Sequence, residues 1–439
     1  MNVIYLHTHD TGRWIEPYGY NVPTPNLSKF AEEGTIFRNA YCAGPTCSPS
    51  RSALLTGMAP HSTGMLGLAH RGFQLNDYSQ HLAQFLGQNG LETVLCGIQH
   101  EAPSANMIGY DRILDEQDYN MGSYNTDWTE WDMKRARTVA DFLRKEHKKP
   151  FFLSLGLFNT HREFPQISEE INPNYVAPPF PLYDNHDNRV EMARYMSSAK
   201  VVDQCFGIVM EALKETGLEN DTLVIFTTDH GLAFPFMKCN LFDTGIGVSL
   251  ILRFPGNQRK GEALDTLVSQ IDLFPTICDM LRIERPEWLQ GESLMPILQK
   301  EKEKVHDEIF AEVTYHAAYE PMRCIRTERY KLIRFFDDWD KPVPANIDDS
   351  LSKTFLVQNG YLSTSKDREF LFDLYLDPME RTNLIGNNDY LPIYQELASR
   401  LRQWMEETDD HLLKGKVEKP ERARINKRDC LSPSISDYE

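Results

Sequence analysis

Residues 221–231 read DTLVIFTTDHG, an apolar and β-branched run that ends in Asp229 and His230. Three other segments have the same form, in which apolar residues lead into a polar cluster: VIYLHTHD (3–10), ETVLCGIQH (92–100) and PFFLSLGLFNTH (150–161). Short apolar runs bounded by polar residues predict buried β-strands. All four predicted strands therefore end in aspartate, histidine or both.

Helix-like stretches separate these strands. NLSKFAEEG (26–34) and YMSSAKVVDQCFGIVMEALKETG (195–217) have apolar residues at helical spacing and end in glycine, and 268–283 reads as a later helix. Strands that alternate with helices predict an α/β fold, a large and mainly parallel sheet flanked by helices. The carboxyl ends of parallel strands share one edge of the sheet, where ligands bind. The polar strand ends are therefore candidate site residues.

The pattern changes near residue 305. EIFAEVTY, PMRCIRTERYKLIRFF and EFLFDLYLD look like antiparallel strands with hairpin-like connections, and an amphipathic helix follows over 390–410. We predict two domains, a large α/β domain at 1–304 and a smaller α+β domain with an antiparallel sheet at 305–439. The charge-rich stretch KGKVEKPERARINKRD (414–429) predicts solvated surface.

Composition excludes several kinds of partner. The net charge of −18 over 439 residues argues against nucleic acid and disfavours long polyanionic substrates. No segment is apolar for long enough to cross a membrane. The eight cysteines are scattered without a C-x-x-C pair, which is typical of reduced intracellular thiols. We expect a cytoplasmic protein; its assembly state, monomer or homo-oligomer, stays open.

A second informative stretch is YCAGPTCSPSRSALLTG (41–57). Ser48, Pro49 and Ser50 favour a helix start and Gly57 a helix end, which places Cys47 at the helix N-terminus. Free backbone N–H groups there favour an anion, and Arg51 adds positive charge one turn later. The alternative is an ordinary capped helix with a small buried thiol.

The strand ends and this helix together predict a site for an anionic ester. Asp10 and Asp229 offer hard oxygen ligands beside His9 and His230, a set that suits a divalent metal ion. Positive or hydrogen-bond-donating groups that could hold a tetrahedral anion are found at Arg51, His100, His161 and Lys238. With a nucleophile at the helix start, the set favours an anion-ester hydrolase.

The stretch Cys47-Ser-Pro-Ser-Arg51, followed by Leu55-Thr-Gly57, resembles the sulfatase signature C-x-P-S-R…L-T-G. The resemblance covers nearly the whole chain through TPNLSKFAEEGTIFRNAY, FNTHREFP, TLVIFTTDHG, IDLFPTICDML and LFDLYLDPMERTNL. The chain is thereby identified as a member of the sulfatase family, in the alkaline-phosphatase-like superfamily. CSPSRSALLTG, HSTGMLGLAH, DTLVIFTTDHGLAFP and YEPMR are most similar to the heparan N-sulfatases within it.

The resemblance implies a mechanism and a set of roles. Cys47 would be oxidised to Cα-formylglycine by a formylglycine-generating or anaerobic sulfatase-maturating enzyme, and its hydrate would attack sulfur. His100 would help deprotonate the second hydroxyl, which then ejects sulfate. Arg51 would orient the hydrate, and His161 and Lys238 would bind sulfate oxygens, with His161 protonating the leaving group. One divalent ion, calcium by resemblance, would be held by Asp10, Asp229, His230 and residue 47.

Three positions depart from the family pattern. His9-Asp10 replaces the common Asp-Asp, so His9 is a weaker candidate ligand. Asp229-His230 replaces Asp-Asn and is similar to choline sulfatases and phosphonate monoester hydrolases; imidazole favours manganese, magnesium or zinc over calcium. Ile98 replaces the sulfate-binding lysine of the G-K-x-H motif. The missing cation could be supplied by His70, Arg71 or Arg13.

These features favour hydrolysis of a sulfate ester or N-sulfate on a small substrate, a sulfated sugar. In HAAYEPMR, His316 and Arg323 would reach the part of the substrate that does not react, or would only stabilise the contact between the domains. One alternative is a phosphonate or phosphate diester hydrolase with the same nucleophile. A second is an inactive binder of sulfated glycans.

Overall fold

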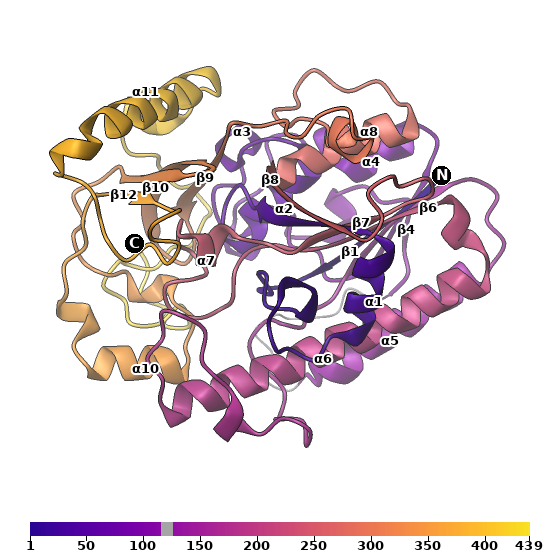
Figure 1. Ribbon diagram of the computed structural model, residues 1–439, viewed down its shortest axis with the longest axis horizontal. Coiled ribbons are helices and arrows are strands. Elements are labelled where there is room, and N and C mark those ends of the chain that lie inside the picture. The colour runs from indigo at the N-terminus through magenta and orange to yellow at the C-terminus, as the bar shows by residue number, and fades with distance from the viewer. Residues whose placement is uncertain (116–125) are drawn as a thin grey trace.

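The computed structural model describes residues 1–115 and 126–439, and its larger part is built on one twisted sheet (Figure 1). In the described residues this sheet has eight strands in the order β4-β3-β5-β1-β6-β7-β2-β8. Their bounds are β1 Asn2–Thr8, β2 Thr35–Tyr41, β3 Glu92–Gly97, β4 Arg112–Ile113, β5 Phe151–Gly156, β6 Thr222–Thr228, β7 Leu250–Arg253 and β8 Glu262–Ser269.

The prediction of a mainly parallel sheet is confirmed. The four predicted strands are β1, β3, β5 and β6, which are parallel neighbours in the middle of the sheet. β7 is antiparallel to both β6 and β2. Every residue of β1, β5 and β6 is buried, as expected for strands covered on both faces.

Helices cover both faces of the large sheet (Figure 1). Leu54 on α2 packs with Leu82 on α4 and Phe274 on α8 in one core, and Phe30 on α1 packs with Phe206 on α6 in the other, which α5 completes. The bounds are α1 Pro25–Glu33, α2 Cys47–Thr56, α4 Leu82–Gln88, α5 Trp128–Leu143, α6 His186–Glu215 and α8 Leu273–Leu281, with short helices α3 Pro60–Thr63, α7 Asp243–Ile246 and α9 Met295–Leu298. No helix within the described residues has both the length and the apolarity to span a membrane.

A separate antiparallel sheet forms in the C-terminal part, as predicted, in the order β12-β11-β10-β9. Its helix α11 buries Leu397, Leu401 and Met405 on one side, the apolar stripe that the sequence contains. The domain boundary at 304/305 stays a prediction. The bounds are β9 Glu308–Tyr315, β10 Tyr319–Thr327, β11 Tyr330–Phe335, α10 Leu351–Gln358, β12 Glu369–Asp373 and α11 Leu391–Glu407.

The charged stretch at 414–429 differs from the prediction of solvated surface. Ala423 and Ile425 are buried in a cluster with Phe73 and Tyr315, and Asn426 is also buried. The apolar residues between the charges pack while the charged ones face outward, so composition alone misjudged the segment. The C-terminal segment thereby returns to the N-terminal half of the chain.

Strand register gathers the polar strand ends. Thr8 at the end of β1 pairs with Thr228 of β6, and Gly156 of β5 pairs with Gly97 of β3. The pair of glycines is required sterically, because a Cβ on Gly97 would lie 2.1 Å from the carbonyl oxygen of Gly156. Close strand ends place the residues that follow them at one edge of the sheet.

We predict that Gly97→Ala destabilises the protein more than Gly90→Ala. Both glycines have a positive φ, +82° and +90°, but a Cβ on Gly90 meets nothing within 4 Å. Gly90→Ala should cost about 1–2 kcal/mol for the backbone conformation alone. Gly97→Ala adds the clash with β5, so its free energy of unfolding in urea should fall by at least twice as much. Equal losses would contradict the close approach.

Candidate active site

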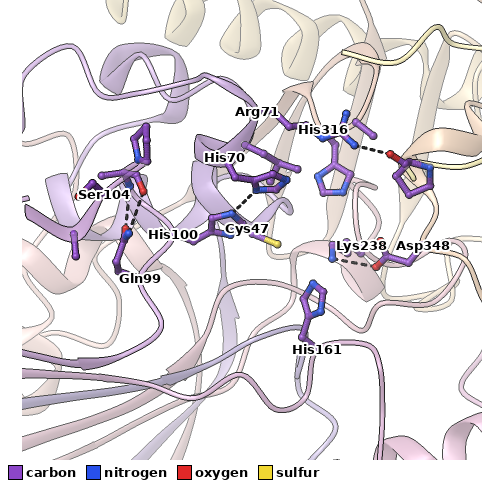
Figure 2. A pocket seen from close by; sticks show the side chains of 16 residues that line it. Cys47, His70, Arg71, Gln99, His100, Ser104, His161, Lys238, His316 and Asp348 are labelled. Carbon is purple, nitrogen blue, oxygen red and sulfur yellow. Dashed lines mark hydrogen bonds and ion pairs between the residues drawn. The ribbon is translucent and has the colours of Figure 1, made fainter. Parts of the chain in front are cut away.

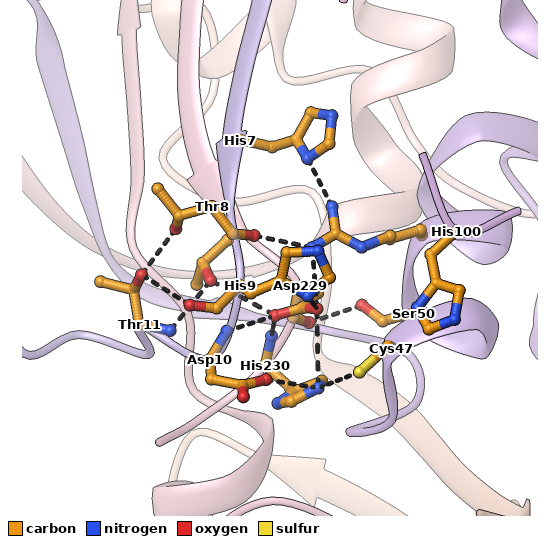
Figure 3. A network of polar contacts seen from close by, with 12 residues as sticks. His7, Thr8, His9, Asp10, Thr11, Cys47, Ser50, His100, Asp229 and His230 are labelled. Atoms are coloured by element: carbon orange, nitrogen blue, oxygen red, sulfur yellow. Dashed lines mark hydrogen bonds and ion pairs between the residues drawn. The ribbon is translucent and has the colours of Figure 1, made fainter. Parts of the chain in front are cut away.

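Asp229 lies at the centre of the site, directly after β6 (Figure 3). Its Oδ1 accepts hydrogen bonds from the backbone N–H groups of Asp10, at 2.8 Å, and His230, at 2.9 Å. Its Oδ2 accepts from Arg51 Nη2 at 2.9 Å. Burial acts to raise the pKa of Asp229, but the electrostatic effects of His230, Arg51 and Lys238 and the hydrogen bond from the Asp10 N–H together outweigh it and bring the pKa to about 2. The carboxyl is therefore ionised at neutral pH.

Helix α2 is fixed to Asp229 by Ser50 and Arg51, near its N-terminus. Ser50 Oγ donates to the backbone oxygen of Asp229 at 2.5 Å, and Arg51 Nη2 also donates to the backbone oxygen of Thr8 at 2.8 Å. Arg51 Nη1 contacts His7 Nδ1. The arginine is only 1% exposed. The Ser-Arg pair of the signature thus holds the helix N-terminus against the ends of β1 and β6.

The residues around Asp229 form a buried cluster of metal-ligand type. One donor atom each from His9, Asp10, Cys47 and Asp229 lies within 4.8 Å of the others. Both ring nitrogens of His9 and Oδ1 of Asp10 lack a hydrogen-bond partner among the described residues. Buried polar atoms normally have partners. His9 Nδ1 lies 3.4 Å from Asp229 Oδ2, although the two form no hydrogen bond. Two carboxylates beside buried nitrogen and oxygen donors that make no hydrogen bond fit a divalent cation.

His230 faces the same cluster. Its Nε2 lies 3.3 Å from Asp10 Oδ1, 3.6 Å from Asp229 Oδ2 and 3.5 Å from Cys47 Sγ. Its other ring nitrogen is 3.0 Å from the backbone oxygen of Gly231, which fixes the ring orientation. The structure therefore brings together all five residues predicted as metal ligands, His9, Asp10, Cys47, Asp229 and His230.

A cavity of about 560 Å³ opens over this cluster. Figure 2 shows the Cys47 sulfur pointing into the space between His100, His161 and Lys238. Those three residues line the cavity with Cys47, and so do His70, Arg71 and His316. Nine residues were predicted for catalysis or substrate binding, and six of them border this one cavity. Arg71, a further candidate for the missing cation, borders it as well. Arg51 lies behind the metal-type cluster instead.

The side chains bordering the cavity differ in charge. Lys238 Nζ lies 3.3 Å from Asp10 Oδ2 and 3.0 Å from Asp348 Oδ2. His100 Nε2 is 2.8 Å from His70 Nδ1. Burial, and then His70 and Arg51, lower the pKa of His100 well below its ordinary value, so the ring is neutral and can accept a proton. The pKa of His316 is also lowered well below its ordinary value, first by burial and then by the charge of Lys238.

The structure does not bring Arg13 and Arg323 to the cavity, which corrects both expectations. Arg13 donates to the backbone oxygen of Ala40 at 2.9 Å and lies over the Tyr41 ring. Arg323 is fully buried, and its Nε lies 2.6 Å from Asp410 Oδ2. Both side chains make their contacts with other residues of the protein interior and not with the cavity. The partners of Arg323 are Asp410, Glu312 and the 313–314 segment, all inside the predicted C-terminal domain, so its printed contacts do not join the two domains either.

Ile98 occupies the place of the family lysine as a core residue. It is fully buried in a cluster with Trp128, Trp131 and Phe158. Its side chain thus belongs to the aromatic core beside α5. Of the residues considered in its place, His70 and Arg71 both border the cavity. Burial lowers the pKa of His70 to about 4, so His70 is not a cation at neutral pH. Arg71 Nη1 donates to Asn426 and Nη2 to the backbone oxygen of Pro433.

Two residues of the site were missed by sequence reasoning. His7 supports Arg51 and has its Nε2 3.3 Å from Ser154 Oγ. It lies inside a predicted strand, where a buried histidine carries no distinguishing signal. Asp348 borders the cavity from a loop between β11 and α10, and no motif surrounds it. Only the tertiary structure identifies Asp348.

Comparison with known proteins agrees with this arrangement. The sulfatase family model matches residues 1–283, and the model for the N-sulphoglucosamine sulphohydrolase C-terminal region matches 229–343. Human N-sulphoglucosamine sulphohydrolase is 28% identical over 93% of this chain and 90% of its own length.

Solved structures share the fold. A 2-O GAG sulfatase has a TM-score of 0.73 at 21% identity, covering 96% of this chain and 95% of its own. The phosphonate monoester hydrolase of Agrobacterium radiobacter has a TM-score of 0.72 at 20% identity, covering 96% and 98%. The match of the sulfatase model to more than half of the chain decides the family. The chain belongs to the sulfatase family, and its activity is that of a sulfuric ester or sulfamate hydrolase.

Proposed function

We propose that this protein removes sulfate from a small sulfated sugar, with residue 47 as a formylglycine nucleophile. The observation that carries the proposal is the position of Cys47. Its sulfur lies at the start of α2, borders the cavity and is 3.5 Å from His230 Nε2 in a buried cluster of carboxylates and imidazoles. Cys47 also lies inside the motif through which the family's maturating enzymes recognise their substrate. Such an enzyme is therefore a proposed partner.

The metal-type cluster is the proposed cofactor site. Asp10, Asp229 and His230 would hold one divalent ion, together with residue 47 and, less strongly, His9. When bound, such an ion withdraws electron density from a sulfate oxygen and so favours attack at sulfur. Calcium is the ion that the family resemblance favours, while the imidazoles favour manganese, magnesium or zinc.

The residues of this chain then divide the chemistry. A hydroxyl of the hydrated residue 47 releases its proton to solvent and forms a bond to sulfur as the S–O or S–N bond of the substrate breaks, and His161 supplies a proton to the departing group. His100, which is neutral, takes the proton of the second hydroxyl. The C–O bond to sulfate then breaks, and the aldehyde is restored. Lys238 balances the negative charge of the sulfate oxygens.

A small sulfated sugar is favoured as the substrate for three reasons. Human N-sulphoglucosamine sulphohydrolase is a relative over most of the chain. The cavity, at about 560 Å³, is in the usual range for small-molecule sites. The net charge of −18 disfavours a long anionic polymer.

One specific observation supports a second candidate function. His230 replaces the common asparagine and its ring faces the metal-type cluster, a pairing that resembles phosphonate monoester hydrolases. A phosphonate or phosphate diester would then react with the same nucleophile. Turnover of an aryl sulfate against an aryl phosphonate by the matured protein separates the two, and a higher kcat/KM for the phosphonate would favour this second function.

We predict that residue 47 is converted to formylglycine when the protein is made together with a maturating enzyme. Trypsin releases residues 39–51, NAYCAGPTCSPSR, in which the unmodified Cys42 is an internal control for mass spectrometry. Cys47→Ala should abolish turnover without changing the unfolding midpoint, and Cys47→Ser should stall as its sulfate ester. Undiminished turnover in Cys47→Ala would refute the mechanism.

We predict that Asp10→Asn and Asp229→Asn lower metal content and turnover together, because each removes a hard anionic ligand. Metal per protein is measured by elemental analysis after dialysis. Glu312→Gln is the matched control: Glu312 contacts His61 in the other cluster of this type among the described residues, and Arg323 already balances its charge. A full complement of metal in Asp229→Asn would contradict the assignment.

We predict hydrolysis from the end of a short substrate, with little action on intact heparan. Repulsion by the acidic surface acts over about 8 Å at physiological salt and opposes a polymer that extends past the cavity. The check compares kcat/KM on a sulfated monosaccharide and on the polymer at equal sulfate concentration. Equal or faster turnover of the polymer would rule out this substrate class.

A further inference from the structure

A carboxylate borders the cavity where the substrate carries negative charge. Asp348 lies in the loop before α10, and its side chain is 18% exposed. Burial acts to raise its pKa, but Lys238 and, less strongly, His161, His316 and Arg162 together outweigh this, and the pKa lies well below the ordinary value. Asp348 is therefore ionised and only accepts hydrogen bonds. Beside a sulfate site this charge opposes binding, so its presence there needs an explanation.

The position of Asp348 provides one. A second cavity of about 740 Å³ adjoins the first, and the residues common to both are His161, Asp348 and Pro433. In the proposed function, His161 protonates the leaving group. The organic part of the substrate would then lie near His161 and so near Asp348, since both border the two cavities.

A second buried group points to the same ligand. His316, in the turn between β9 and β10, is 5% exposed and borders the first cavity. Its Nδ1 has no hydrogen-bond partner within the described residues. Figure 2 places His316 and Asp348 on the Lys238 side of the cavity, across from His100. A buried, unpaired ring nitrogen is costly unless a ligand or water pairs with it.

We propose that Asp348, with His316, is a specificity-determining residue that binds hydroxyl or amino donors of the sugar ring next to the sulfated position. The inference rests on the proposed function and deepens it. A carboxylate accepts from two neighbouring donors at once, and the His316 ring pairs with a third group. The substrate class is thus a sugar that presents donors, rather than a carboxylate, to this wall.

The test compares two substrates in one variant. Wild type and Asp348→Asn, both matured and loaded with metal, are assayed with the preferred sulfated monosaccharide and with 4-nitrophenyl sulfate, which has no ring hydroxyls. Loss of charge-assisted hydrogen bonds should lower the ratio of kcat/KM for sugar to aryl sulfate about 10- to 100-fold. His316→Leu should lower the same ratio, and serves if Asp348→Asn does not fold.

Asp349→Asn is the matched control, because Asp349 is the adjacent carboxylate and its Oδ1 lies 2.8 Å from Lys353 Nζ instead of Lys238. It should leave the ratio unchanged. If Asp348 only positions Lys238, both substrates lose turnover equally and the unchanged ratio overturns the proposal. If the wild-type protein turns over neither the sugar sulfate nor the aryl sulfate, the proposed function itself is wrong. That outcome is distinct from an unchanged ratio, which contradicts only the role of Asp348.

Discussion

The buried carboxylate of Asp229 is the interaction on which the site depends. Burying an unpaired charge costs several kcal/mol, and this carboxylate is fully buried. It is stabilised by two backbone N–H groups and by Arg51, while its backbone oxygen accepts from Ser50. These partners come from β1, β6 and α2. The hydrogen bonds that stabilise the buried charge of Asp229 therefore also fix the relative positions of α2 and the ends of β1 and β6, around which the site is built.

This arrangement explains why the signature surrounds the nucleophile with serine and arginine. Ser50 donates to the backbone oxygen of Asp229, and Arg51 binds Asp229, Thr8 and His7. These hydrogen bonds fix the position of the start of α2 relative to the ends of β1 and β6. A reacting group misplaced by about 1 Å can lose about 100-fold in rate, so in the proposed mechanism the support of residue 47 would matter as much as residue 47 itself.

The sequence was most informative where a pattern is repeated. The central strands are fully buried, so their apolar runs and polar ends were visible, and the strand ends did meet. Strand β2 was missed because Arg38 and Asn39 interrupt its apolar pattern, and β7 because it has only four residues. Arg13 and Arg323 were placed by nearness in sequence to site residues, yet nearness does not fix the direction of a long side chain. Asp348 is 110 residues away from Lys238 in the sequence and reaches the cavity only through tertiary packing, which no local pattern encodes.

The two parts of the chain contribute unlike groups to the cavity. Residues that would act on sulfur follow strands of the large sheet or begin α2, where the backbone is held by neighbouring strands on both sides. His316 and Asp348 come instead from a turn and a loop of the C-terminal part. Loops tolerate substitution better than strand ends. Substrate preference can therefore change in this architecture through these loops while the chemistry at Asp229 stays fixed, and the pairing of Lys238 with both Asp10 and Asp348 is where the two contributions meet.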